Sequence, residues 1–96
     1  MKKSFNEIIN QEVPVLVDFY ADWCGPCKNM APILTQLKSE LKDAVSIIKI
    51  NVDTNPALAS KYQVQGVPTF IVFKNGIQTW RQSGMQTSSQ LKQAIL

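Results

Sequence analysis

The segment Trp23-Cys24-Gly25-Pro26-Cys27-Lys28 contains the only two cysteines of the 96-residue chain. Before it, residues 15–20 are β-branched, aliphatic and aromatic apart from one acid, a composition that predicts a buried strand. After it, residues 28–41 carry apolar side chains at helical spacing. The two cysteines are therefore expected to open a helix that directly follows a strand.

This position favours reactive thiols. The first turn of a helix leaves backbone N–H groups unpaired and carries the positive end of the helix dipole, which stabilises a thiolate relative to a thiol. With helical geometry from Cys24 onward, the side chain three residues later lies on nearly the same face, so the two sulfur atoms come within bonding distance. Pro26 fits the first turn, where its missing N–H costs nothing.

The length and composition of the chain predict one globular domain over residues 1–96, with 45% hydrophobic and 8% aromatic residues. A disulfide that spans only three positions removes little entropy from the unfolded chain, so it would add little stability. Cys24 and Cys27 are better explained by reactivity than by structural cross-linking.

Several classes of function are disfavoured. Two cysteines and no histidine leave a tetrahedral zinc site two ligands short, so a zinc ion could be held only by bridging two chains, an alternative that stays open. The net charge is +3, but the ten Lys and Arg residues are scattered, and no apolar run is long enough to cross a membrane. Neither nucleic acid nor a membrane is therefore an expected partner.

The start of the chain bears on where the protein works. Residues 1–3 are charged like the beginning of a signal peptide, but polar residues interrupt the apolar region that should follow. We therefore expect no export by that route and a cytoplasmic protein in a reducing compartment.

Helices are predicted at both ends of the chain and in its middle. Ser4 and Glu7 form a capping box for a short helix, and Thr87 begins a second capping box for an amphipathic terminal helix. Asn55 is expected to cap a connecting helix whose first residue is Pro56, and nothing in that connector suggests chemistry.

Three further strands are predicted. Residues 45–52 are dense in β-branched side chains, and residues 69–73 and 77–82 flank Asn75-Gly76, a strong signal for a hairpin turn. Helical crossovers join parallel strands, whereas the hairpin joins antiparallel ones. The order of elements therefore predicts an α/β fold with a mixed sheet.

The cysteine motif, together with Val17-Asp18-Phe19 before it and Ala31-Pro32 after it, resembles the thioredoxin family. The resemblance covers essentially the whole chain and implies the thioredoxin fold. The family usually has a strand ahead of the first helix, whereas only residues 1–3 precede Ser4 here. We therefore expect a four-stranded sheet flanked by helices, with the strand from Val45 to Asn51 on an exposed edge or covered by a partner chain. The protein would then be a monomer or a weak dimer.

Asp18 and Lys49 are the polar residues of two otherwise apolar strands. A buried carboxylate must be paired or carry a raised pKa, unless Asp18 instead belongs to a turn. The resemblance implies that Asp18 exchanges protons with Cys27. Lys49 either points to solvent or, as the resemblance implies, tunes Asp18.

The resemblance also assigns residues to the substrate-binding surface. It implies a cis peptide between Val67 and Pro68 that lies against the two sulfur atoms, although Pro68 could be an ordinary edge-strand proline. It implies that Gly84 belongs to the same docking surface, where the alternative is a flexible loop glycine. The other expected members are Trp23, Gly25 and Pro26, with a purely structural role as the alternative for Trp23.

The expected function is reduction of disulfide bonds in other proteins. An exposed Cys24 would attack the substrate and form a mixed disulfide, which the shielded Cys27 would resolve. The chain has no cofactor-binding motif, so electrons would come from NADPH through an external flavin-dependent thioredoxin reductase. The alternative is a protein-binding module that docks partners on the surface around Val67, Pro68 and Gly84 and whose redox chemistry is incidental.

Overall fold

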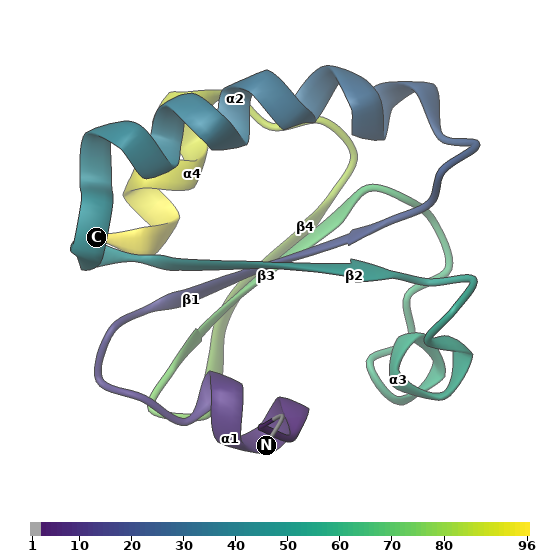
Figure 1. The fold of residues 1–96 in the computed structure, drawn as a ribbon, viewed down its shortest axis with the longest axis horizontal. Coiled ribbons are helices and arrows are strands. Elements are labelled where there is room, and N and C mark those ends of the chain that lie inside the picture. Colours follow the sequence, from purple (N-terminus) through teal and green to yellow (C-terminus); the bar gives the residue numbers. More distant parts are fainter. Residues whose placement is uncertain (1–2) are drawn as a thin grey trace.

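The computed structural model describes residues 3–96 and shows helices on both sides of one central sheet (Figure 1). The prediction that no strand precedes Ser4 rests in part on residues 1–2, which lie outside the described residues. The elements, in chain order, are α1 (Phe5–Ile9), β1 (Val15–Tyr20), α2 (Gly25–Leu41), a 3₁₀ helix (Lys42–Ala44), β2 (Ser46–Asn51), α3 (Pro56–Lys61), β3 (Thr69–Lys74), β4 (Ile77–Ser83) and α4 (Ser88–Ile95).

The sheet has four strands in the order β2-β1-β3-β4. Strand β1 pairs in parallel with β2 and antiparallel with β3, and β3 pairs antiparallel with β4. This confirms the predicted mixed sheet and places β2 at one edge. Within residues 3–96, no strand other than β1 pairs with β2.

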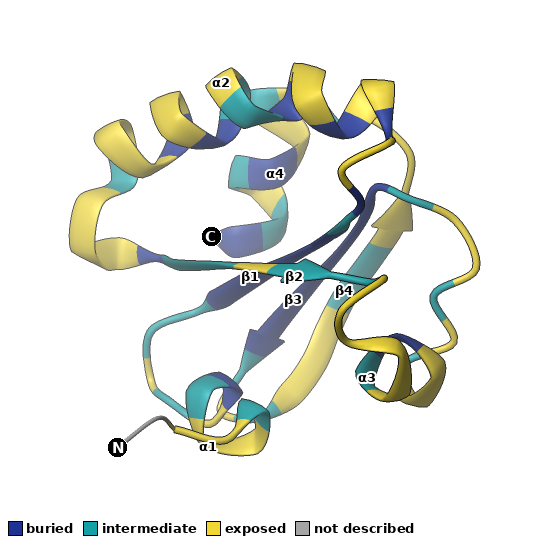
Figure 2. Ribbon diagram, turned by 45° about the vertical axis from the view of Figure 1, so that its right-hand side comes forward, coloured by how far each residue is buried: buried dark blue, intermediate teal, exposed yellow. Residues whose placement is uncertain are grey.

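Burial follows position in the sheet. The central strands β1 and β3 are buried along almost their whole length, while the edge strands β2 and β4 are half-buried or exposed (Figure 2). Strands that are covered on both faces are expected to be apolar throughout, and β1 and β3 are the two most apolar runs of the chain. Asp18 is therefore a carboxylate in the most buried part of the molecule.

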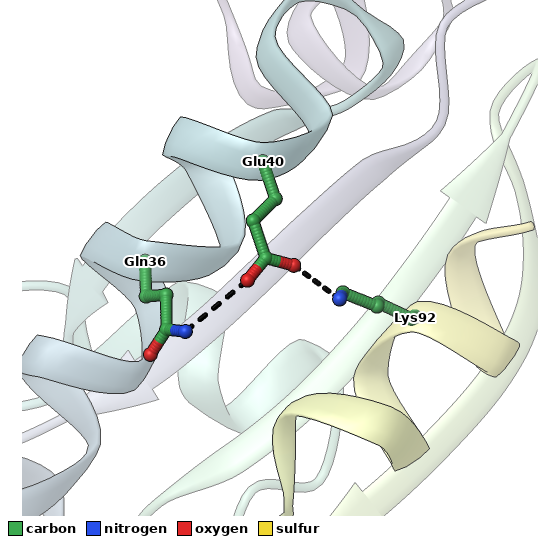
Figure 3. Close-up of polar contacts among 3 residues, drawn as sticks. All are labelled: Gln36, Glu40 and Lys92. Carbon is green, nitrogen blue, oxygen red and sulfur yellow. Dashed lines mark hydrogen bonds and ion pairs between the residues drawn. The ribbon is translucent and has the colours of Figure 1, made fainter.

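Two apolar clusters lie on opposite faces of the sheet, because successive side chains of a strand point to opposite sides. Helices α2 and α4 cover the face that carries Leu16, and the short helices α1 and α3 lie on the face that carries Val17 (Figure 1). Asp18 is two residues from Leu16 and one from Val17, so it lies on the α2 side of the sheet. Figure 3 shows a polar link between the two covering helices, in which Glu40 of α2 accepts a hydrogen bond from Gln36 of the same helix and pairs with Lys92 of α4.

Local signals in the sequence account for most helix starts. The capping boxes predicted at Ser4 and Thr87 are both present. Asn55 occupies the predicted cap position of α3, but its side chain does not cap the helix, so this detail of the prediction is wrong. The reason is local competition, because the Asn55 amide donates to the Asn51 carbonyl at 3.0 Å.

The β3–β4 hairpin has the predicted turn. Asn75 and Gly76 both adopt positive φ angles, 52° and 80°, as a type I′ turn requires. The Gly76 N–H donates to the Ile9 carbonyl at 3.0 Å, so the turn is attached to the end of α1.

Candidate active site

The two cysteines lie at the start of α2, directly after β1. They form a disulfide with Cα atoms 5.3 Å apart. Cys24 is the extended N-cap residue and Cys27 is in the first turn, so helical geometry begins at Gly25 and not at Cys24 as expected. The cap position leaves the Cys24 sulfur free to accept the Cys27 N–H at 3.1 Å. One of the unpaired amides of the helix end therefore points at the sulfur, which favours negative charge there.

The expected difference in exposure between the two cysteines is absent in this oxidised form, and that prediction is wrong for it. Cys24 is 4% exposed and Cys27 is 7% exposed. Both are covered because the disulfide packs with Ala21 and is flanked by Val52 and Val67. An exposed Cys24 therefore requires a change around the sulfur atoms in the reduced or substrate-bound form.

Two segments that are distant in the sequence, Val67–Pro68 and Gly84, meet each other, and the first of them lies against the disulfide. The Val67–Pro68 peptide is cis, as the resemblance implied, and Val67 packs against the cysteine pair. Gly84 donates its N–H to the Pro68 carbonyl at 2.7 Å. Its φ of 88° favours glycine, and a side chain added there would meet no neighbouring atom within 4 Å, so the surface at Gly84 is open. Gly25 and Pro26 are also exposed.

Trp23 is 70% exposed, and its indole Nε1–H donates to Asp53 at 2.9 Å. Asp53 lies in the connector between β2 and α3, a segment whose sequence suggests no chemistry. No local signal links the two residues, because they are 30 positions apart. The hydrogen bond fixes an aromatic side chain beside Cys24 and connects the motif to the end of β2.

Asp18 is 1% exposed, and its Oδ1 has no hydrogen-bond partner among the described residues. Burial raises the pKa of Asp18 from 3.8 to about 6, and the positive charge of Lys49 opposes that rise. Desolvation is therefore the larger effect. A carboxyl group with a pKa near 6 can take up or release a proton close to neutral pH.

The position of Lys49 is compatible with both alternatives that the sequence left open. It is exposed to solvent, yet it lies directly across from Asp18 in the β1–β2 register. Its ammonium group lies 4.8 Å from the centre of the Tyr20 ring, a cation–π contact that sequence reasoning missed. Tyr20, Cys27 and Lys49 line one hollow on the α2 side of the sheet, together with Ala21, Asp22, Lys28 and Ala31.

Metal and membrane features are not found in the part of the chain that the structure describes. No group of three or more potential metal-ligating side chains occurs within residues 3–96. None of the helices there has the length and apolar character needed to span a bilayer.

The arrangement is suited to thiol–disulfide exchange. This chemistry uses a sulfur at a helix N-terminus and a second sulfur within bonding distance. It also uses a nearby backbone segment with an open surface and a buried carboxyl group with a raised pKa. The structure brings Cys24, Cys27, Val67, Pro68 and Gly84 together. Asp18 and Lys49 lie beneath α2 in adjacent strands.

Comparison with known proteins gives concordant results. The family model described as Thioredoxin matches residues 1–96. A thioredoxin of Rickettsia typhi is 44% identical over 86 residues, which cover 90% of this chain and 82% of the relative. Thioredoxin Y2 of Arabidopsis thaliana, a chloroplastic protein, is 46% identical over 93 residues, 96% of this chain and 56% of the relative. Among solved structures, a variant thioredoxin from Halobacterium salinarum has a TM-score of 0.87 at 39% identity and covers 99% of this chain and 82% of its own.

Proposed function

Because this chain belongs to the thioredoxin family, whose members are thiol–disulfide oxidoreductases, we propose that it reduces disulfide bonds in other proteins. The observation that carries the proposal is the position of the Cys24–Cys27 disulfide. The Cys24 sulfur caps helix α2, and Val67 packs against the disulfide. Val67 precedes the cis Pro68, whose carbonyl accepts the Gly84 N–H at the open surface.

The reaction starts from the reduced protein. The Cys24 thiolate attacks one sulfur of the substrate disulfide, whose S–S bond breaks, and the other substrate sulfur leaves as a thiolate that takes up a proton. The Cys27 thiol then loses its proton and attacks the Cys24 sulfur. The mixed disulfide breaks, the second substrate thiolate leaves, and the Cys24–Cys27 disulfide forms. Two electrons pass from the protein to the substrate.

Asp18 is the proposed acceptor of the Cys27 proton. Its raised pKa and its place on the α2 side of the sheet support this role, and Lys49 across the register adjusts how readily the carboxyl ionises. Resolution of the mixed disulfide is the step that needs this proton transfer, whereas the first attack uses a thiolate that the helix end already stabilises.

The proposed substrate-binding surface consists of Trp23, Gly25, Pro26, Val67, Pro68 and Gly84. All but Val67 and Pro68 are exposed, and Val67 is half-buried. Such a surface leaves the backbone of the segment around Val67 accessible to an extended substrate, which can pair with it through main-chain hydrogen bonds.

Electrons would be restored by NADPH through an external flavin-dependent thioredoxin reductase. A reducing compartment is required. The cytoplasm is the compartment we propose, and the chloroplastic thioredoxins among the similar proteins make a chloroplast the alternative. The half-exposed edge strand β2 makes a monomer or a weak dimer the proposed state, which sedimentation over a range of concentrations would decide.

A coupled assay with NADPH, a thioredoxin reductase and a disulfide-containing protein tests the proposal. We expect NADPH consumption that depends on this protein and is lost when Cys24 and Cys27 are both replaced by Ser. Consumption no higher than that of the reductase alone would refute the proposed reaction.

The same double substitution tests the alternative of a binding module. If a cell that depends on this protein grows equally well with the double-Ser variant, partner docking on the surface around Val67, Pro68 and Gly84 is the function. Loss of growth with retained folding supports the reductase.

A further inference from the structure

Within residues 3–96, the outer edge of β2 offers an open row of backbone hydrogen-bonding groups. The N–H groups of Ser46 and Val52 donate to β1-side carbonyls of Pro14 and Tyr20, both at 2.9 Å. Successive residues of a strand direct their backbone N–H and C=O groups to opposite edges. The N–H and C=O groups of Ile47, Lys49 and Asn51 therefore point away from β1.

Both ends of this row are closed. The Val45 carbonyl accepts the Lys38 ammonium at 2.6 Å, and the Asn51 carbonyl accepts the Asn55 N–H at 3.0 Å. Within β2, the backbone groups that remain available on the outer edge are the N–H and C=O of Ile47, the N–H and C=O of Lys49, and the N–H of Asn51. This row is long enough to pair with about five residues of an added strand.

The side chains around the row have a distinct chemistry on each face. On the α2 face, two adjoining hollows share Lys49 and Ala31 and are lined by the exposed lysines Lys28, Lys38 and Lys49, with Asp22 as the one acid in the lining. On the opposite face lie the half-buried apolar side chains of Ile48 and Ile50.

We propose that the β2 edge binds an extended acidic segment of another protein, which adds to the sheet as an antiparallel strand. Its backbone pairs with Ile47 and Lys49, its acidic side chains lie on the lysine-lined α2 face, and its apolar side chains pack against Ile48 and Ile50. A second copy of this chain fits less well, because self-pairing brings the two Lys49 residues close together.

This site differs from the proposed substrate surface but adjoins it. Strand β2 ends at Asn51, and Asp53 just beyond is hydrogen-bonded to Trp23. A partner held on β2 therefore has one end at the side of the molecule that carries the disulfide. The proposal does not depend on redox activity, because it can be tested on the oxidised protein with no turnover.

The test uses the oxidised full chain and a seven-residue end-blocked peptide that alternates valine and glutamate. Backbone amide NMR is expected to show the largest changes at Ile47, Lys49 and Asn51. A peptide with lysine in place of glutamate is expected to bind at least about tenfold more weakly at low ionic strength. The Lys49→Glu variant should reverse this preference.

Backbone methylation of the peptide supplies a control that leaves the protein unchanged. In the antiparallel arrangement, residues that pair with Ile47 and Lys49 place their side chains on the α2 face, so the glutamate amides face β2 and the valine amides face solvent. N-methylation of the glutamates should abolish binding, and N-methylation of the valines should preserve it.

A protein variant gives the complementary control. Ile47→Pro removes an outward N–H and leaves the β1–β2 bonds intact, so it should prevent binding, while Ile47→Val should not. Changes centred on Val67 and Gly84, equal affinity for the glutamate and lysine peptides, or binding that survives glutamate methylation would overturn the proposal. Concentration-dependent shifts of the β2 amides without peptide would instead identify a second copy as the occupant and overturn it too.

Discussion

Asp18 couples the stability of the fold to pH. The folded state binds its proton more tightly than the unfolded chain, because burial raises the pKa from 3.8 to about 6. The contribution of Asp18 to stability is therefore most favourable below about pH 4, and it is lost as the pH rises through about 6.

Asp18→Asn removes the free-energy cost of burying an ionised carboxylate above about pH 6. At pH 7.5 the oxidised variant should unfold with a free energy higher by about 2 to 3 kcal/mol than that of the parent chain, and at pH 3.5 the two should be equal. Urea unfolding at the two pH values checks this. A gain of the same size at both would show that packing, and not ionisation, is responsible.

The same substitution separates the two chemical steps of the proposed reaction. Asp18→Asn should slow release of the second substrate thiol at neutral pH more than it slows formation of the mixed disulfide. Rapid-mixing measurements on the reduced protein follow both steps. Equal slowing would remove Asp18 from the proton-transfer role.

Lys49 should act on Asp18 through its charge. Lys49→Met is expected to raise the pKa of Asp18 above 6, because the opposing positive charge is lost. Lys28→Met is the matched control, since Lys28 lines the same hollow but is not among the causes of the Asp18 shift. Carboxyl ¹³C NMR titration of the oxidised protein measures both, and equal shifts in the two variants would contradict a specific effect of Lys49.

Among the elements, α3 and α4 differ in how their first turns are satisfied. The Thr87 hydroxyl accepts the Gln90 N–H at 3.1 Å, whereas Asn55 makes no side-chain cap. Thr87→Ala should therefore lower the free energy of unfolding by about 1 kcal/mol. Asn55→Ala should cost less, and thermal or urea unfolding compares them. A larger loss at Asn55 would show that its bond to Asn51 matters more than a helix cap.

Element boundaries were predictable where the signal is local. The capping residues Ser4 and Thr87 and the turn Asn75-Gly76 fix their own neighbourhoods through hydrogen bonds and allowed φ angles that span a few residues. Strand β1 was predicted with its observed bounds, because Pro14 ends the preceding segment and Asp22 follows shortly after the apolar run. Asn55 shows the limit of this reasoning, since a nearby carbonyl competes for the same side chain.

On the scale of the whole molecule, α4 closes the core on the α2 side of the sheet. Leu91 is fully buried there, whereas Leu96 is 78% exposed. Leu91→Ala should lower the free energy of unfolding by about 2 to 5 kcal/mol, and Leu96→Ala by less than about 0.5 kcal/mol. Equal effects in urea unfolding would mean that α4 does not contribute to the core in solution.

The site is assembled by contacts that no local pattern contains. The motif around Cys24 and Cys27 was evident from the sequence, and the family resemblance supplied Val67, Pro68 and Gly84. The Trp23–Asp53 hydrogen bond and the Lys49–Tyr20 contact were not foreseen, because tertiary packing decides which exposed side chains meet. The burial of Cys24 was also missed, although that of Cys27 was predicted, because it depends on Val52 and Val67 from elsewhere in the chain.

The half-exposed strand β2 also has a consequence for the behaviour of the protein in concentrated solution. Ile47, Ile48 and Ile50 form the kind of short β-branched segment that stacks into intermolecular sheets, and Lys49 is the one charge that interrupts it. We therefore expect Lys49 to act as a gatekeeper against aggregation, in addition to opposing the rise in the pKa of Asp18. Because one side chain serves both purposes, colloidal stability and proton affinity at Asp18 cannot be adjusted independently at this position.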